Sequence, residues 1–145
     1  MRRLLKQVVW ARLAPYDLSP QQFWVMLVLL EKGPSSLHPL AQQVWMDDPT
    51  ASRVVKAMVG RNLLTARPDP RHGRRILIDL APAALPLARE LQALATDLRE
   101  FMSAGLSPDE QEALKGGLRT MVGNLKSMLT TVPAAGTGEG EVAAS

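Results

Sequence analysis

The sequence predicts a mainly α-helical fold with one small β-hairpin, and three observations lead to this prediction. Aromatic residues make up only 4% of the 145 residues, and strand-like alternation of apolar and polar residues is scarce. Apolar residues recur instead at three- and four-residue steps along most of the chain. A short run rich in branched residues, 76–80, predicts a strand. We expect one domain over residues 1–132, because a chain of this length can bury its own core.

The first two helices have clear boundaries in the sequence. A helix is expected over residues 2–14, where Pro15 ends it. A second helix begins at Ser19-Pro20-Gln21-Gln22, with Ser19 as its N-cap, and it stops at Gly33-Pro34.

A helix-turn-helix is predicted next. A short helix is expected over residues 37–44. After a turn, Asp48-Pro49-Thr50 opens a longer helix that runs to about Arg61, with Asp48 as its cap. Two helices of these lengths joined by a short turn form the helix-turn-helix arrangement, whose second helix enters the major groove of DNA.

The helix-turn-helix is followed by a predicted β-hairpin with a basic tip. Its strands are expected over residues 63–67 and 76–80, and the segment between them holds Arg71, Arg74 and Arg75. Such a hairpin can insert its arginines into the minor groove, as a wing does. The alternative is a solvated tip whose charges prevent aggregation through the strand edges. We favour the wing, which makes residues 18–81 a winged helix-turn-helix.

The net charge of +3 conceals an uneven distribution. Residues 1–75 hold twelve Lys and Arg against five Asp and Glu, whereas residues 76–145 hold five against nine. The basic half predicts a polyanionic partner, although charge alone is equally compatible with a solvated surface. Together with the helix-turn-helix, this asymmetry predicts binding to double-stranded DNA.

Candidate DNA contacts lie around the helix-turn-helix and on the wing. Small and hydroxylated side chains near the start of the second helix allow a close approach to base edges, and Ala51 could touch a thymine methyl group. Arg53 fits either a bidentate contact with guanine or a phosphate contact, whereas Lys56 and Arg61 are better phosphate candidates. The predicted DNA-binding residues are Ser36, Thr50, Ala51, Ser52, Arg53, Lys56, Arg61, Arg71, Arg74 and Arg75.

Two long amphipathic helices are predicted after the hairpin, over residues 82–104 and from Ser107-Pro108 onward. The second carries a heptad-like stripe, which is either intramolecular core or the seam of a dimer. Because the winged helix-turn-helix already has a small core, we expect a homodimer formed by residues 2–17 and 82–130. The expected dimerisation residues are Leu4, Leu5, Val8, Leu114, Leu118, Met121 and Leu125. Residues 133–145 are rich in Gly, Ala and Glu and are expected to be disordered.

Several short segments, in this order and spacing, carry a further prediction. They are Leu18-Ser19-Pro20-Gln21-Gln22-Phe23, Leu40-Ala41, Asp48-Pro49-Thr50-Ala51-Ser52-Arg53-Val54-Val55, Asn62-Leu63-Leu64 and Arg67-Pro68-Asp69-Pro70. With these segments, residues 2–130 resemble the MarR family of bacterial transcription regulators. The resemblance implies a homodimer that binds a pseudo-palindromic operator through two winged helix-turn-helix lobes. It also implies a repressor, released when a small aromatic or anionic ligand binds between the dimerisation and DNA-binding regions.

The wing departs from the pattern of the family it resembles. The family has Asp-Arg-Arg before the second strand, whereas this chain has His72-Gly73-Arg74, so the aspartate coupled to the arginine is missing. The family's Leu-Thr-x-x-Gly is replaced by Leu80-Ala81-Pro82-Ala83-Ala84, which lacks a hydroxyl helix cap. We expect a more mobile wing tip, to which His72 adds positive charge below about pH 6.5.

Candidates for a ligand site are few. Trp10 and Trp24 fall where the family's ligand crevice would lie, and tryptophans suit an aromatic effector; the alternative is that both belong to the core. His38 and Trp45 are likewise either ligand-site residues or core residues. The chain has two histidines without an acidic cluster and has no cysteine, so we expect no metal, no cofactor and no thiol redox switch.

Other functional classes fit the sequence less well. We expect no enzyme, because the sequence shows no phosphate loop, nucleophile elbow or paired-carboxylate signature. A ligand-independent DNA-binding regulator and a winged-helix protein–protein adaptor remain alternatives, but an adaptor gives no reason for a basic wing. The longest apolar run, Phe23 to Leu30, is too short to span a bilayer, and no cleavage site follows the basic, apolar segment Met1 to Leu13. We therefore expect a cytoplasmic protein without a membrane partner.

Overall fold

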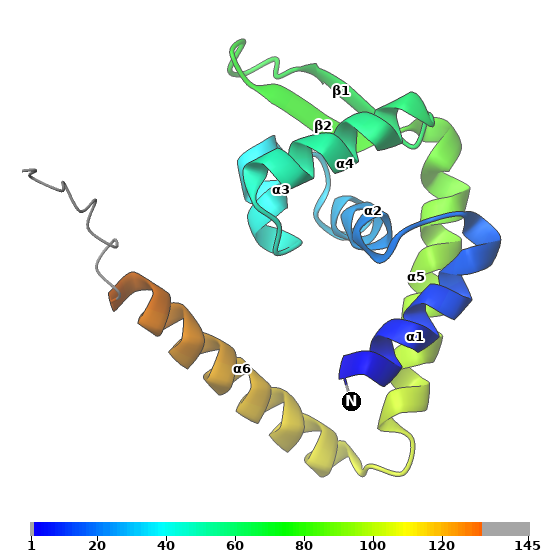
Figure 1. The fold of residues 1–145 in the computed structure, drawn as a ribbon, viewed down its shortest axis with the longest axis vertical. Coiled ribbons are helices and arrows are strands. Elements are labelled where there is room, and N and C mark those ends of the chain that lie inside the picture. The colour runs from blue at the N-terminus through cyan, green and yellow to red at the C-terminus, as the bar shows by residue number, and fades with distance from the viewer. Residues whose placement is uncertain (1, 132–145) are drawn as a thin grey trace, which may run out of the picture. The chain divides into compact units, whose positions relative to one another are not determined.

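A computed structural model describes residues 2–131 and confirms the predicted mainly helical fold with one β-hairpin (Figure 1). The chain divides into two compact units at Arg99. The first unit holds α1 to α4, the hairpin and most of α5, and the second holds the end of α5 and all of α6. The segment 133–145, for which disorder was expected, lies outside the described residues. The elements are α1 (Arg2–Leu13), η1 (Ala14–Tyr16), α2 (Pro20–Lys32), α3 (Leu37–Gln43), α4 (Asp48–Gly60), β1 (Leu64–Pro68), β2 (Ile76–Leu80), η2 (Pro82–Ala84), α5 (Leu85–Ser103) and α6 (Pro108–Thr131).

Most helix boundaries follow the capping residues of the sequence. The Ser19 hydroxyl accepts a hydrogen bond from the Gln22 N–H, and the Gln22 side chain accepts one from the Ser19 N–H, so a capping box starts α2. One predicted cap was wrong by one residue, because the N-cap of α4 is Asp47 and the helix itself begins at Asp48. Asp47 lies three residues before Thr50, and its carboxylate accepts a hydrogen bond of 2.7 Å from the Thr50 N–H.

The core of the first unit lies where α2, α3, α4, the hairpin and the first part of α5 pack together. Each helix contributes apolar residues at three- and four-residue steps, as the sequence predicted. The buried residues of this core include Phe23, Met26, Leu29, Leu40, Met58, Leu64, Ile78, Leu80, Ala88 and Leu91. No polar or charged side chain of the described residues is buried, so the groups that could bind a partner lie at the surface.

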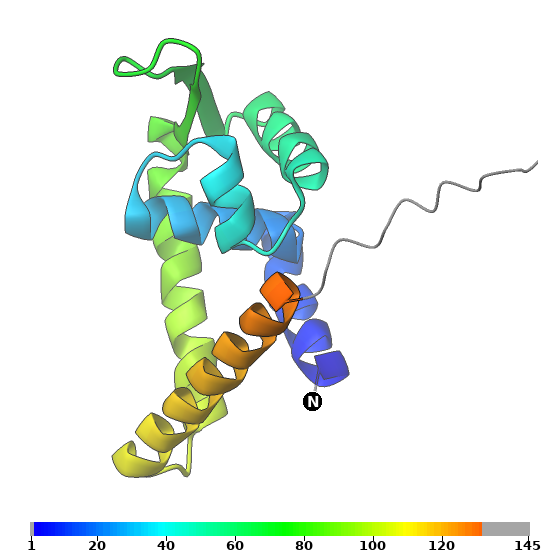
Figure 2. The ribbon, with the colours of Figure 1, turned by 90° about the vertical axis from the view of Figure 1, so that its left-hand side faces the viewer.

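The hairpin is attached to the helix-turn-helix at its base. β1 and β2 pair antiparallel, from Leu64 opposite Leu80 to Pro68 opposite Ile76. The backbone of Ser35, just before α3, forms two more hydrogen bonds with Ile78, of 2.9 and 2.8 Å. The tip of the hairpin projects beyond α3 and α4 (Figure 2).

The last two helices are present as predicted, but the first of them starts later than expected. Pro82–Ala84 form a single 3-10 turn, and α5 begins only at Leu85, because Ala81 offers no side-chain cap. A second capping box, between Ser107 and Glu110, starts α6. Within residues 2–131, every helix is too short or too polar to cross a bilayer.

Candidate nucleic-acid interface

The outer side of α4 carries the hydroxyl and cationic side chains expected of a recognition helix. Arg53 and Lys56 are exposed, and Thr50 and Ser52 are partly exposed within the first two turns. Ser36 is also partly exposed, at the start of α3. The structure therefore presents these five predicted contacts at the surface of the helix-turn-helix.

Two predicted DNA contacts of α4 have other roles. Ala51 is 1% exposed, because it lies on the same inward face as Val55, so the prediction that it touches DNA was wrong. The Arg61 guanidinium donates a hydrogen bond of 2.7 Å to the backbone oxygen of Asp17. It also lies 3.5 Å from Gln22 Oε1 and 3.8 Å from the Asp17 carboxylate. Arg61 thus holds the end of α4 against the segment before α2, and we remove it from the candidate DNA contacts.

The N-cap of α4 has a perturbed acidity. Hydrogen bonds from Thr50, first from its side chain and then from its N–H, lower the pKa of Asp47 below its usual value. The positive charge of Arg53 acts in the same direction, and the small cost of burial acts against it. Asp47 is therefore a carboxylate whose charge stabilises the positive end of the helix dipole.

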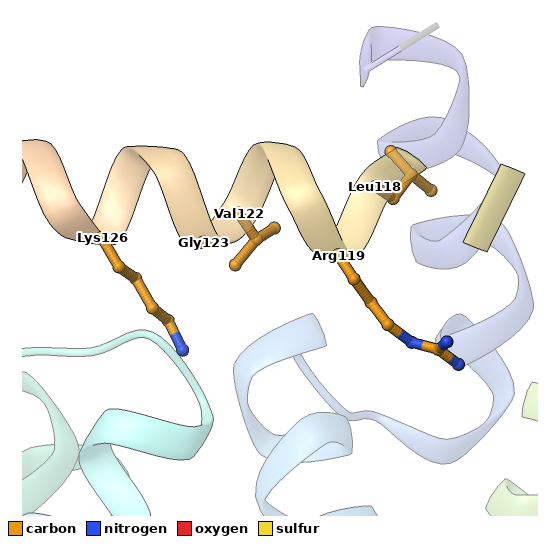
Figure 3. Close-up of a pocket in the computed structure, with 5 residues that line it drawn as sticks. All are labelled: Leu118, Arg119, Val122, Gly123 and Lys126. Atoms are coloured by element: carbon orange, nitrogen blue, oxygen red, sulfur yellow. The ribbon is translucent and has the colours of Figure 1, made fainter. Parts of the chain in front are cut away.

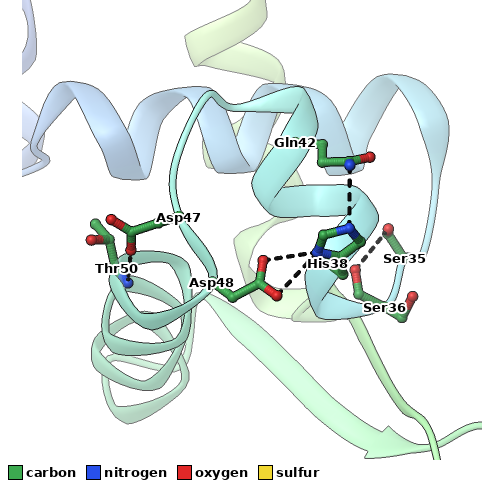
Figure 4. A network of polar contacts seen from close by, with 7 residues as sticks. All are labelled: Ser35, Ser36, His38, Gln42, Asp47, Asp48 and Thr50. Atoms are coloured by element: carbon green, nitrogen blue, oxygen red, sulfur yellow. Dashed lines mark hydrogen bonds and ion pairs between the residues drawn. The ribbon is translucent and has the colours of Figure 1, made fainter. Parts of the chain in front are cut away.

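A polar network joins α3 to the start of α4 (Figure 4). His38 Nδ1 lies 3.0 Å from both carboxylate oxygens of Asp48, and Gln42 Nε2 lies 3.2 Å from His38 Nε2. His38 was predicted only as a ligand-site or core residue, and its pairing with Asp48 was not predicted. The signal was present, because His38 stands in the first turn of one helix and an acid begins the next.

The wing presents its predicted arginines to solvent. Arg71, Arg74 and Arg75 are exposed, and no ion pair in the described part of the chain involves them. The tip folds around Asp69, whose carboxylate accepts a hydrogen bond of 2.9 Å from the Arg71 N–H. The Asp69 backbone oxygen accepts another from the His72 N–H at 3.2 Å. These local bonds close the turn in the absence of the family's ionic pair, and greater mobility of the tip stays a prediction.

The predicted ligand-site tryptophans are half exposed in the single chain. Trp10 is 48% and Trp24 is 50% exposed, and Trp24 packs edge-on against Phe23 at 5.2 Å. Neither lines the cavity of about 500 Å³ found in the first unit. That cavity lies between α2 and α5, and its lining includes Leu27, Glu31, Arg89, Gln92, Ala93 and Asp97.

The predicted dimerisation residues are uncovered in the single chain. Leu118 is 53% and Leu125 is 61% exposed, and α6 buries none of its residues. Figure 3 shows Val122 with Arg119 and Lys126 along the same helix, where five residues line a shallow hollow. The remaining exposed members of the predicted set are Leu4, Leu5, Val8, Leu114 and Met121.

Comparison with known proteins identifies the family. Residues 16–75 match the model of the MarR family. The solved structure of a "probable transcriptional regulator" from Pseudomonas aeruginosa is 30% identical, with a TM-score of 0.70, over 82% of this chain and 90% of that one. The chain belongs to the MarR family. As a MarR-family protein, it is a DNA-binding transcription regulator and not an enzyme.

Two further regulators are similar to this chain. The chain is 27% identical over 106 residues to the HTH-type transcriptional repressor NicR of Pseudomonas putida, covering 73% of this chain and 67% of NicR. It is 26% identical to BpsR of Bordetella bronchiseptica, with a TM-score of 0.74 over 83% of this chain and 86% of BpsR. The DNA binding of BpsR is regulated by 6-hydroxynicotinic acid.

Proposed function

We propose that this protein is a homodimeric repressor that binds a pseudo-palindromic operator and is released from it by a small aromatic or anionic ligand. The observation that carries the proposal is the exposed face of α4 beside an exposed basic wing within one compact unit. Cations that have no intramolecular ion pair can neutralise backbone phosphates and release their counterions. A protein–protein adaptor, the alternative function, would not need exposed cations on α4 and on the wing.

The proposed contacts divide between the two grooves. Arg53 reads a guanine edge in the major groove, and Lys56 binds a neighbouring phosphate. Arg74 and Arg75 bind the minor groove and its phosphates from the wing. The full set of proposed DNA contacts is Ser36, Thr50, Ser52, Arg53, Lys56, Arg71, Arg74 and Arg75.

The homodimer is proposed because apolar side chains of α1 and of α6 are exposed among the described residues. A stripe of exposed leucine and methionine at alternating four- and three-residue steps is typical of a helix that packs against another helix. A two-fold pair would present two recognition helices to half-sites about one helical turn apart.

Genomic footprinting of the purified protein tests the regulator proposal. We expect protection of a palindrome upstream of the protein's own gene, and a steep loss of affinity as salt rises. A reporter gene behind that palindrome should be transcribed less when the protein is present. Binding without a salt-dependent preference for any palindrome would instead favour the adaptor, and increased transcription would show an activator.

The effector proposal rests on the cavity between α2 and α5 and on the two tryptophans. A cavity of about 500 Å³ has room for a small aromatic molecule, and Arg89 in its lining supplies a cation. Because the DNA binding of BpsR responds to 6-hydroxynicotinic acid, this compound is a suitable first probe.

Calorimetric titration of the full protein with 6-hydroxynicotinic acid and with benzoate tests the effector proposal. We expect binding that Arg89→Gln weakens if the cavity is the site, or that Trp24→Phe weakens if the tryptophans form it. Arg67→Gln, on β1 and outside the cavity lining, is the matched control for Arg89→Gln and should leave the affinity unchanged. If neither acid binds or alters operator affinity, the ligand-independent regulator is the better description.

A further inference from the structure

His38 and Asp48 form a hydrogen-bonded side-chain pair between α3 and α4, and it lies beside the proposed DNA contacts. Asp48 is the first residue of α4, two positions before Thr50, and His38 is two positions after Ser36. Their side chains are 65% and 51% exposed. Exposed pairs of this kind add little to folding stability even when both groups are charged, so stability alone gives a weak reason for this pair.

The hydrogen bonds are compatible with an imidazole that carries its proton on Nδ1. The Gln42 amide N–H can donate to His38 Nε2 only if that nitrogen carries no proton. Nδ1 then carries the proton and donates it toward the Asp48 carboxylate. With that tautomer, the pair in Figure 4 carries a net charge of −1.

That negative charge opposes the proposed function of the helix that carries it. The start of a recognition helix approaches the phosphates that flank the major groove, where a carboxylate is repelled. If His38 is protonated, the imidazolium and Asp48 together carry no net charge. The pair can remain intact, because Nδ1 still donates to Asp48 and the Gln42 amide can rotate to offer its oxygen to Nε2.

We propose that His38 couples DNA binding to protonation, so that the protein takes up a solvent proton at this position when α4 binds DNA. The proposal rests on the DNA-binding face described above. The phosphates and Asp48 both favour the charged imidazole in the complex, and both side chains are open to the solvent that supplies the proton. DNA affinity therefore rises as the pH falls.

The surroundings of His38 contain few other charges that bear on this coupling. α3 itself has no further charged residue, and it packs against α2, α4 and β2. The Asp47 carboxylate accepts a hydrogen bond from the Thr50 N–H, and the Asp79 carboxylate accepts one from the Leu80 N–H. The other ionisable side chains on the packed elements are Glu31, Lys32, Arg53 and Lys56.

The two histidines of the chain allow a matched experiment. A duplex selected by the protein from a random-sequence pool is titrated at constant ionic strength between about pH 6 and pH 8, on either side of the ordinary histidine range. We expect the wild-type affinity to rise as pH falls, by about threefold to tenfold per pH unit for each recognition helix. His38→Asn keeps a donor near Nδ1 but cannot be protonated, and it should abolish most of this rise. His72→Asn makes the same change in the wing and should remove at most a small part of the rise, which would report the wing's own contribution.

Two more variants fix the sign of the effect. His38→Lys carries a permanent cation, so it should bind at pH 8 about as tightly as the wild type at pH 6. Asp48→Asn removes the repelled carboxylate and should bind more tightly than the wild type at pH 8. A wild-type pH dependence that His38→Asn leaves unchanged would overturn the proposal.

A measurement without DNA separates this proposal from the proposed function. Nitrogen-15 NMR of the free protein at high pH should show His38 protonated at Nδ1 and bare at Nε2. The opposite tautomer would contradict the arrangement that the proposal needs. Failure to bind any duplex at any pH would overturn the DNA-binding face itself, whatever the tautomer.

Discussion

Side chains at the start of α4 have two separate roles, which are to cap the helix and, as proposed, to contact DNA. Asp47 holds the helix start through Thr50, whereas Arg53 is exposed one turn later and contributes positive charge to the same region. Among the described residues Arg53 forms no ion pair, so its guanidinium donors are open to DNA. The wing arginines are equally exposed but extend from a hairpin tip, where backbone phosphates are the nearest anions.

Substitution of Arg53 should change which sequences the protein prefers. We expect Arg53→Ala to relax the preference at one base pair of each half-site and to cost about 1–3 kcal/mol there. Selection from a random-sequence pool, followed by affinity measurements on single-base variants, measures both the base preference and its free-energy cost. Arg74→Ala and Arg75→Ala should weaken all sequences alike and lower the salt slope by about one each. Equal, preference-neutral losses from all three would mean that Arg53 is only a phosphate contact.

The cap of α4 predicts a pH dependence of stability. Because the folded pKa of Asp47 lies below its unfolded value, its charge stabilises the fold above that value, about 3.9, and this contribution is lost as pH falls through the folded pKa. Asp47→Asn keeps an acceptor for the Thr50 N–H but not the charge. Its Tm should lie below that of the wild type at pH 7, and the difference should shrink as the pH falls below about 3.9. Asp47→Ala also loses the hydrogen-bond acceptor, so it should be less stable than Asp47→Asn both at pH 7 and at low pH. A difference between wild type and Asn that does not change with pH would contradict this account.

At the scale of elements, Arg61 fixes the far end of α4. Its hydrogen bond to the Asp17 backbone joins residues 44 positions apart in the sequence. Arg61→Ala should lower stability by about 1 kcal/mol and weaken DNA binding without changing the salt slope, because no phosphate contact is lost. Lys56→Ala is the matched control on the same helix, and it should lower the slope by about one while leaving Tm unchanged. A lower slope for Arg61→Ala, with an unchanged Tm, would return Arg61 to the DNA contacts.

The elements themselves could be predicted because their signals are local. The capping box at Ser19, the branched run 76–80 and the proline after Ser107 each specify a boundary from neighbouring residues. Two adjacent aspartates left the cap of α4 ambiguous by one residue, since either carboxylate could reach an N–H. The missed features depend on contacts between elements. The roles of Ala51 and Arg61 follow from what packs beside them, and that information is absent from local spacing.

At the scale of the whole molecule, the uncovered stripe of α6 predicts the oligomeric state. Leu118→Glu combined with Leu125→Glu should convert a dimer into a monomer, because four charges would otherwise be placed in one apolar seam. Sedimentation at equilibrium measures the mass. Ser127→Glu, on the opposite side of the helix by its spacing, is the control and should leave the dimer intact. An unchanged mass for the double variant would refute the seam.

The paired hydrogen bonds between Ser35 and Ile78 have a consequence for how operators are chosen. They join the first residues of the helix-turn-helix to the middle of the wing's second strand, so the separation between α3 and the base of the wing is fixed by the backbone. The distance between the two DNA-contacting parts of the winged helix-turn-helix is therefore constant from one operator to the next. Operators whose minor groove lies at a different distance from the adjacent major groove have to deform to fit, and the cost of that deformation selects among sequences at base pairs that no side chain touches.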